Sequence, residues 1–208
     1  MLDTSLLPLF LTAVAALVLV PGPDMALILS QSVARGSRAG LWCAFGIALA
    51  GLVQTVLVAA GLGALLQTLP ALAEAVRWLG VIYLSWLGYQ ALRRLGQPVE
   101  AIVAPVPLRK LWLGAMLNNL LNPKALLFFS LFLPQFTQPA LGHLTWQLLT
   151  LGLLLTGIAL LWNIVLALLA GQLARHLTRL GSGRFGDSLL GVVFLGLAAR
   201  LAWSGPLR

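Results

Sequence analysis

Long stretches without any charged side chain dominate the chain. Aspartate, glutamate, lysine and arginine are absent from residues 4–23, 39–73 and 125–174. A helix crosses a bilayer with about 20 apolar residues, so each of the two longer stretches must hold more than one pass, or one pass and a turn. Because 60% of the residues are hydrophobic and only 9% are charged, against about 25% charged in soluble domains, we expect this chain to lie in lipid.

The apolar pattern divides into six predicted membrane segments. They cover residues 5–33, 39–66, 71–94, 110–136, 144–173 and 186–204. Open strands cannot span lipid, and the alternating pattern of a membrane barrel is absent from the sequence. The chain is therefore predicted to be an all-α integral membrane protein with six transmembrane helices in a single transmembrane domain, residues 1–208.

Positive charges in the loops predict how the segments are oriented. They collect in the loops after the first, third and fifth segments, at Arg35, Arg38, Arg93, Arg94, Arg109, Lys110, Arg175, Arg179 and Arg184. Lysine and arginine stay on the cytoplasmic side, so both termini are predicted to be periplasmic, in the inner (plasma) membrane of a bacterium. Residues 95–108 hold three prolines and are expected to form the cytoplasmic connection between the two halves, residues 1–94 and 109–208.

Two proline interruptions stand inside otherwise apolar segments. Residues 18–29 read VLVPGPDMALIL, and residues 118–129 read NNLLNPKALLFF. Proline removes a backbone N–H and clashes with the carbonyl one turn back, so the first and fourth helices are predicted to be discontinuous. The residues of interest at these interruptions are Pro21, Gly22, Pro23, Asp24, Asn122, Pro123 and Lys124.

The two interruptions occupy matching places, each in the first helix of a three-helix half. Because three is an odd number, the second half enters the membrane from the opposite side, and the fold is predicted to be two inverted three-helix repeats. In such folds two broken helices meet near the membrane midplane and form a binding site, where N–H ends face anions and carbonyl ends face cations.

Asp24 and Lys124 are the charged residues that lie well inside their segments. Burying either one at the bilayer centre costs about 2.5–3.5 kcal/mol on insertion scales. We expect the two side chains to face one cavity, to compensate each other, and to bind substrate and protons together with the neighbouring interruption residues. The alternative is that both prolines are simple kinks whose charges reach an interface, with Asp24 turned toward Arg35.

Three asparagines precede the second interruption. Asn118 and Asn122 are four residues apart and share one helix face, and Asn119 lies beside them. The sequence allows two roles for these amides: contact with a ligand, or hydrogen bonds to the carbonyls that Pro123 leaves without partners.

Further polar residues stand alone in apolar helices. Gln54 and Asn163 are lone amides, for which interhelical hydrogen bonding is the first expectation and a place along a transport pathway the second. Tyr83, Trp86 and Tyr89 fall roughly on one helix face. That face lines a cavity or belongs to an interfacial aromatic belt.

Several functional classes are disfavoured by the sequence. The net charge of +8 lies in short loops, which indicates membrane topology and argues against nucleic-acid binding. The single cysteine, Cys43, provides no disulfide or metal cluster, and no metal or cofactor is expected. An enzyme is not expected, because there is no HExxH motif, no second intramembrane aspartate and no intramembrane histidine to activate a serine. The binding site expected between two broken helices favours a transporter. A channel or a structural membrane protein is the alternative, although a channel normally has a continuous polar stripe.

Three stretches point to a known family. In chain order they read PGPDMALILSQSVARGSRAGLWCAFGIALAG, LGVIYLSWLGYQALRR and NPKALLFFSLFLPQF. Their order and spacing resemble the LysE/RhtB family of amino-acid exporters over nearly the whole chain. The resemblance implies export of amino acids or related small zwitterionic metabolites from the bacterial cytoplasm, generally driven by the proton gradient.

The proposed charge pair bears on the substrate. A cavity in which Asp24 and Lys124 compensate each other has a net charge near zero, which favours a neutral amino acid such as threonine, homoserine or leucine over lysine. Asp24 is expected to alternate between a protonated state and a charged state that pairs with Lys124 or with the substrate ammonium. The expected partners are thus an amino acid, protons and the lipid bilayer, and a homodimer is left open.

Overall fold

The computed structural model describes residues 5–61 and 107–178, together with isolated positions between 71 and 89 and at 195 and 199. All regular structure in this described part is helical, which confirms the prediction of an all-α chain; the six-helix inverted repeat stays a prediction. Most of the predicted third and sixth segments (71–94 and 186–204) and nearly all of the predicted connection 95–108 lie outside the described residues.

The first predicted segment consists of two helices. Helix α1 covers Leu7–Leu19, helix α2 covers Pro23–Arg35, and their axes differ in direction by 51°. Gly22 adopts an extended conformation at the start of α2, and Pro23 occupies the first turn, where its missing N–H costs nothing. The two prolines around Gly22 therefore end one helix and begin the next within a few residues.

The fourth predicted segment is interrupted in the same way. Helix α7 covers Leu108–Leu120 and helix α8 covers Pro123–Leu127, followed by the π-helical turn η1, Phe128–Phe132, and the 3-10 turn η2, Leu133–Phe136. The bend between Leu108–Leu120 and Lys124–Phe136 is 60°. The Asn122 side chain caps α8 by accepting a hydrogen bond from the Lys124 backbone N–H at 3.0 Å.

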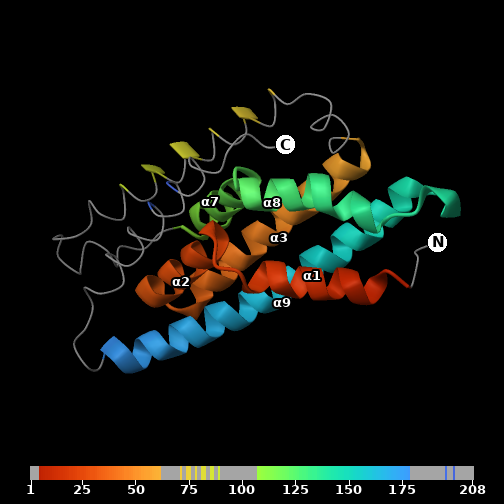
Figure 1. Ribbon diagram of the computed structural model, residues 1–208. Helices are drawn as coiled ribbons and strands as arrows, with labels where there is room; N and C mark the ends of the chain where they lie inside the picture. The colour runs from red at the N-terminus through yellow and green to blue at the C-terminus, as the bar shows by residue number, and fades with distance from the viewer. Residues whose placement is uncertain are drawn as a thin grey trace.

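Two unbroken helices are long and apolar enough to cross a membrane. Helix α3 covers Ser37–Ala59, and helix α9 covers Leu144–Thr178 after the short 3-10 turn η3, Pro139–Leu141. If each bent pair counts as one span, the described residues contain four spans. Figure 1 shows the two bent pairs, α1 with α2 and α7 with α8, arranged along α3 and α9.

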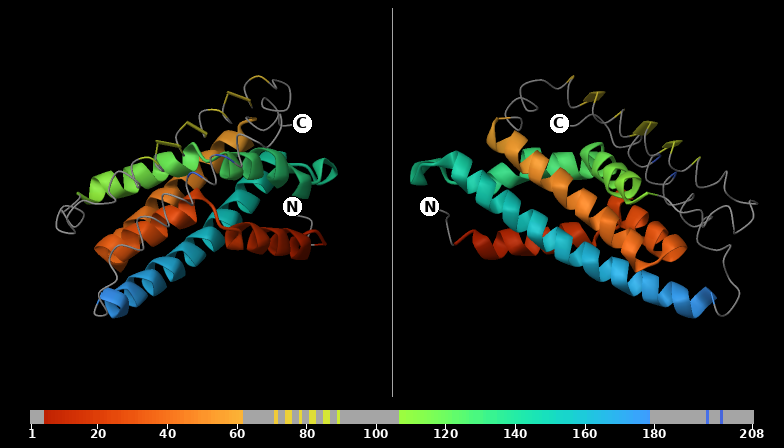
Figure 2. Two further views of the ribbon diagram at one scale, coloured as in Figure 1. Left: turned by 60° about the vertical axis from the view of Figure 1, so that its left-hand side comes forward. Right: turned by 180° about the vertical axis from the view of Figure 1, so that it is seen from behind.

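Helices α3 and α9 lie side by side and run in opposite directions, as the view from behind in Figure 2 shows. Small residues make this approach close. A Cβ atom on Gly51 would meet the Thr156 side chain, and one on Gly152 would meet Thr55. The same G-x-x-x-T pattern, Gly51 to Thr55 and Gly152 to Thr156, thus pairs reciprocally across the crossing, in the manner of small-residue contacts between membrane helices.

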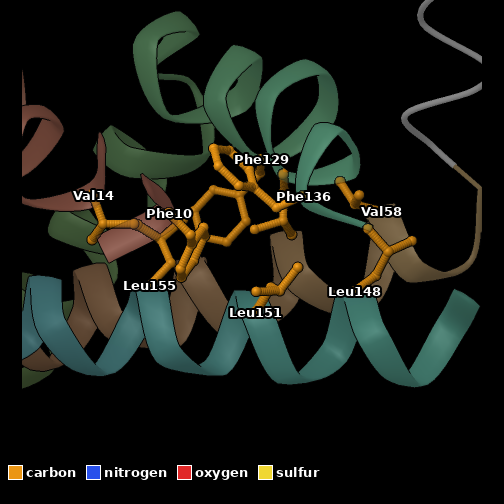
Figure 3. Packing of buried hydrophobic residues seen from close by; sticks show 9 residues of the cluster. Phe10, Val14, Val58, Phe129, Phe136, Leu148, Leu151 and Leu155 are labelled. Atoms are coloured by element: carbon orange, nitrogen blue, oxygen red, sulfur yellow. The ribbon is translucent and has the colours of Figure 1, made fainter. Parts of the chain in front are cut away.

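Two apolar clusters hold the helices together. The phenylalanine-rich cluster (Figure 3) joins α1, the end of α3, η1, η2 and the first half of α9, through Phe10, Val14, Val58, Phe129, Leu133, Phe136, Leu148, Leu151 and Leu155. The alanine-rich cluster joins α2, α3, α7 and the second half of α9, through Ile28, Ala39, Cys43, Ala44, Ile47, Leu111, Ala115, Leu166 and Ala167. The two clusters thus sit on different parts of α9, with one cluster along each half of the helix.

Replacing Gly46 with alanine should destabilise the protein. A Cβ at this position would overlap the backbone carbonyl of Trp112, and backbone cannot rotate away as a side chain can. Overpacking of this kind costs about 1–3 kcal/mol. The melting temperature of the detergent-solubilised protein should therefore fall. Gly114→Ala on α7, where a Cβ would meet nothing within 4 Å, is the matched control and should not lower it. Equal melting temperatures for Gly46→Ala and the unmodified protein would contradict the close helix approach.

Candidate functional site

The Asp24 carboxylate lies in the first turn of α2 and accepts hydrogen bonds from three asparagine side chains. The Asn118 amide donates to Oδ1 at 2.8 Å, and the Asn119 and Asn122 amides donate to Oδ2 at 2.8 and 3.1 Å. An ionised carboxylate only accepts hydrogen bonds, with about four lone-pair positions. The three amides therefore satisfy most of the hydrogen-bonding capacity of the Asp24 carboxylate.

The sequence around the second interruption places these amides. Asn118 and Asn119 belong to the last turns of α7, and Asn122 stands directly before Pro123. Asn122 uses both ends of its amide, because its oxygen caps α8 while its nitrogen donates to Asp24. The asparagines hold a carboxylate from the other broken helix, a role that the sequence did not predict, and Asn122 also caps a backbone end. Their contact with a ligand stays a prediction.

Lys124 at the second interruption contacts the backbone of the first interruption. Its ammonium donates hydrogen bonds to the backbone carbonyls of Leu17 at 2.9 Å and Val20 at 2.7 Å. Both carbonyls lie at the end of α1, where the helix breaks and its last carbonyls have no partner one turn ahead. A cation is also favoured there by the negative end of the helix dipole.

The two interruptions are therefore cross-linked reciprocally. The charge at the start of α2 is bound at the end of α7, and the charge at the start of α8 is bound at the end of α1. A Cβ on Gly22 would lie 3.6 Å from the Lys124 side chain, so the backbone of the first interruption directly faces Lys124. Asp24 turns toward α7 and not toward Arg35, whose guanidinium donates to the Gln31 side chain.

A cavity of about 90 Å³ opens between the two interruptions, α3 and α9. It exceeds the roughly 10–15 Å³ needed to hold one water molecule. Its polar lining consists of Asp24, Asn119, Asn122, Lys124, Thr156 and Asn163. Most of its wall is apolar, and includes Leu17, Val18, Met25, Ile47, Phe128, Phe129, Leu155 and Leu160. Asp24 and Lys124 thus border the same space.

Other residues singled out in the sequence lie around this cavity or away from it. Gly22 lines it, whereas Pro21 is exposed and does not. Asn118 and Gln54 are buried outside the lining, and Gln54 donates to the Asn119 backbone carbonyl at 3.2 Å, which is an interhelical hydrogen bond. Tyr83 lies outside the described residues.

The sequence did not point to two parts of the cavity lining: Thr156 and Leu160 on α9, and the aromatic residues Phe128 and Phe129. Thr156 lies one turn from Leu160 and two turns from Asn163, so all three share one face of α9. The signal available in the sequence was the repeat of G-x-x-x-T in two apolar segments. Phe128 and Phe129 gave no such signal, because aromatic residues in an apolar run are ordinary core residues.

Comparison with known proteins finds matches over nearly the whole chain. A family model described as LysE type translocator matches residues 15–205. The leucine efflux protein of Salmonella typhimurium is 33% identical over 199 residues, which cover 93% of this chain and 92% of that protein. The leucine efflux protein of Klebsiella pneumoniae is also 33% identical, with the same coverage of both chains, and that of an Enterobacter species is 32% identical over 89% of this chain and 90% of its own length. No solved structure matches.

Apolar helices of membrane-spanning length and two broken helices that bring charged side chains to one cavity define a multi-pass membrane protein of the transporter class. The chain belongs to the LysE type translocator family. The family resemblance seen in the sequence is thereby confirmed, and so is the prediction that the chain is a transporter and not an enzyme.

Asn119 should be energetically coupled to Asp24. In a double-mutant cycle with Asn119→Leu and Asp24→Leu, the two losses in the free energy of unfolding should not add, and the coupling should be about 1–2 kcal/mol, because one hydrogen bond to a charged group is counted in both single variants. The measurement is denaturation of the solubilised protein in mixed micelles.

The matched control for this cycle is Asn163→Leu with Asp24→Leu. Asn163 lines the same cavity without donating to Asp24, so these two changes should be additive within about 0.5 kcal/mol. Additive losses in the Asn119 cycle would contradict the geometry of the carboxylate.

Proposed function

We propose that this protein exports leucine and similar neutral amino acids from the bacterial cytoplasm across the inner membrane, by exchange for protons. The observation that carries the proposal is the reciprocal binding of an acid and a base at two helix interruptions that border one cavity. The names of the relatives, leucine efflux protein, support the direction and the substrate.

The chemistry of the cavity fits a zwitterion with an apolar side chain. Asp24 is an acceptor for an ammonium group, and Lys124 is a cation near which a carboxylate is stabilised. The aliphatic and phenyl side chains of the remaining wall suit a leucine side chain. One acid and one base give the cavity no net charge, so a second charge on the substrate would find no partner there.

Proton exchange follows from the hydrogen bonds of Asp24. All three amides donate to this carboxylate, and a proton on either oxygen would remove its negative charge and weaken these bonds, because a neutral carboxyl group is a poorer acceptor than a carboxylate. Protonation therefore loosens the start of α2 from the end of α7. In the proposed cycle, Asp24 is ionised when it holds the substrate ammonium and takes up a proton from the outside when the amino acid leaves.

The halves are proposed to be inverted repeats that rock about the cavity. Proline followed by a charge recurs at the two interruptions, and G-x-x-x-T recurs in α3 and α9. The contacts support this symmetry, because Gly51 faces Thr156 while Gly152 faces Thr55, and each interruption charge binds the opposite interruption.

The proposed orientation has the amino terminus in the periplasm. Ser37 lies against Gly171, and the Cys43 side chain lies 4.0 Å from the Leu111 carbonyl. The α2–α3 junction with Arg35 and Arg38 therefore lies at the same end of the bundle as the start of α7, and Figure 2 shows these elements together. Positive residues favour the cytoplasmic side, and Phe10 of α1 packs near the opposite end of the bundle, with Phe136.

Asp24→Asn should abolish proton-coupled export. The variant cannot bind or release a proton at this position. The imposed pH gradient then no longer drives transport, so leucine movement driven by that gradient should fall at least tenfold. The measurement uses proteoliposomes with labelled leucine and an imposed pH gradient, with and without a protonophore. Glu74→Gln changes a carboxylate that does not line the cavity and should leave transport unchanged.

Two outcomes of this experiment would overturn the proposal. Full proton-driven leucine export by Asp24→Asn would remove the proton role of Asp24. Leucine movement that only ever follows its own gradient, unaffected by the protonophore, would instead identify a channel, which is the competing function for a membrane protein of this kind.

A further inference from the structure

Asn163 differs from the other amides near the cavity in what its side chain binds. Asn119 and Asn122 donate to Asp24, and Gln54 donates to the Asn119 carbonyl. Asn163 lines the cavity, has only 7% of its surface exposed, and makes no side-chain hydrogen bond within the part of the chain that the structure describes. The Asn163 amide is not among the fully buried side-chain atoms without a partner in the described part of the chain. Its polar atoms therefore reach the cavity space, where they are available to a ligand.

The position of Asn163 along α9 gives that explanation. Thr156 lies opposite Gly51 near the middle of α3, and Asn163 lies two turns further along α9, about 10 Å by the rise of an α-helix. Its helix neighbours Leu166 and Ala167 belong to the alanine-rich cluster. Asn163 therefore marks the end of the cavity nearest the arginines of the α2–α3 junction, which is the cytoplasmic end in the proposed orientation.

The cavity-lining residues next to Asn163 on α9, and the one that faces them from α3, are uncharged and apolar. Ala159 and Leu160 lie on the same face of α9, and Ile47 faces them from α3. The charged groups of the cavity, Asp24 and Lys124, are engaged at the two interruptions. A carboxamide can donate to a carboxylate and accept from an ammonium group without favouring either net charge. An aspartate or lysine at this position would favour one sign.

We propose that Asn163 is a specificity-determining residue that hydrogen-bonds the substrate on its cytoplasmic side and selects amino acids with neutral side chains. The inference rests on the proposed function and deepens it. Because the amide is neutral and its surroundings are apolar, a second charge on an incoming amino acid loses its hydration without gaining a partner. The α-amino and α-carboxylate groups of a neutral amino acid, in contrast, can be bound by Asn163 together with Asp24 and Lys124, which lie deeper in the cavity.

Two substitutions test the selection. Asn163→Asp adds a negative charge at the cytoplasmic end and should lower the preference for leucine over lysine at least tenfold. Asn163→Leu removes the hydrogen bond and should raise the leucine concentration for half-maximal binding and transport about fivefold, in line with one lost hydrogen bond. The maximal rate should change less than twofold, because Asn163 does not contact the proton-exchanging carboxylate.

The readouts separate selection from folding. Binding of leucine and of lysine is measured on the detergent-solubilised protein by the rise in melting temperature, and export is measured in proteoliposomes. Asn163→Leu should not lower the melting temperature without ligand, since no protein hydrogen bond is lost. Asn163→Asp places a charge among apolar side chains and should lower it, so its binding of leucine and lysine is read as the shift from its own melting temperature without ligand. Gln54→Leu is the matched control: it breaks a bond to the Asn119 carbonyl, so it should lower the melting temperature while the leucine-to-lysine preference stays unchanged.

The inference is overturned if both Asn163 variants keep the leucine affinity and the leucine-to-lysine preference of the unmodified protein. It is also overturned if Gln54→Leu shifts this preference as strongly as Asn163→Asp does. An unmodified protein that binds leucine selectively but does not export it would count against the proposed function, and the binding of the variants would still decide the role of Asn163.

Discussion

In lipid, every backbone N–H and carbonyl group must find its partner inside the protein, and the architecture of this chain depends on how it meets that requirement at two broken helices. The end of α1 leaves carbonyls without partners, and Lys124 from α8 donates to two of them. The start of α8 needs an acceptor, and Asn122 provides it while donating to Asp24. The first interruption is satisfied by Lys124 from the second, and the residue that caps the second, Asn122, is bound to Asp24 of the first. The two interruptions are therefore tied to each other.

This mutual dependence connects stability to transport. The contacts that make the breaks tolerable in the membrane are hydrogen bonds of an acid and a base. A ligand that competes for the acid or the base therefore acts on the geometry of both bent helix pairs at once. In the proposed cycle, movement of the halves requires no separate sensing element, because the groups proposed to bind the substrate also hold the helix ends together.

The parts of the fold that follow local rules were predictable from the sequence, and the parts that depend on packing were not. Proline, glycine and an adjacent charge in an apolar run predicted both helix breaks, because their effect on a helix is local. The sequence also pointed to Asp24, Lys124 and the asparagines. It did not predict that Lys124 binds the carbonyls of Leu17 and Val20, or that Asp24 accepts from three amides. These contacts join positions about a hundred residues apart, and the apolar wall at Phe128 and Phe129 looks in sequence like any core.

The length of α9 has a consequence for how the protein sits in its membrane. Its 35 residues extend about 52 Å at 1.5 Å per residue, whereas the hydrocarbon layer is about 30 Å thick. Helix tilts in membranes average about 20° and reach about 40°, so inclination alone does not absorb the difference. The carboxyl-terminal turns of α9 consequently stand in the headgroup region or in water, and one unbroken helix runs from the cavity lining to the membrane surface.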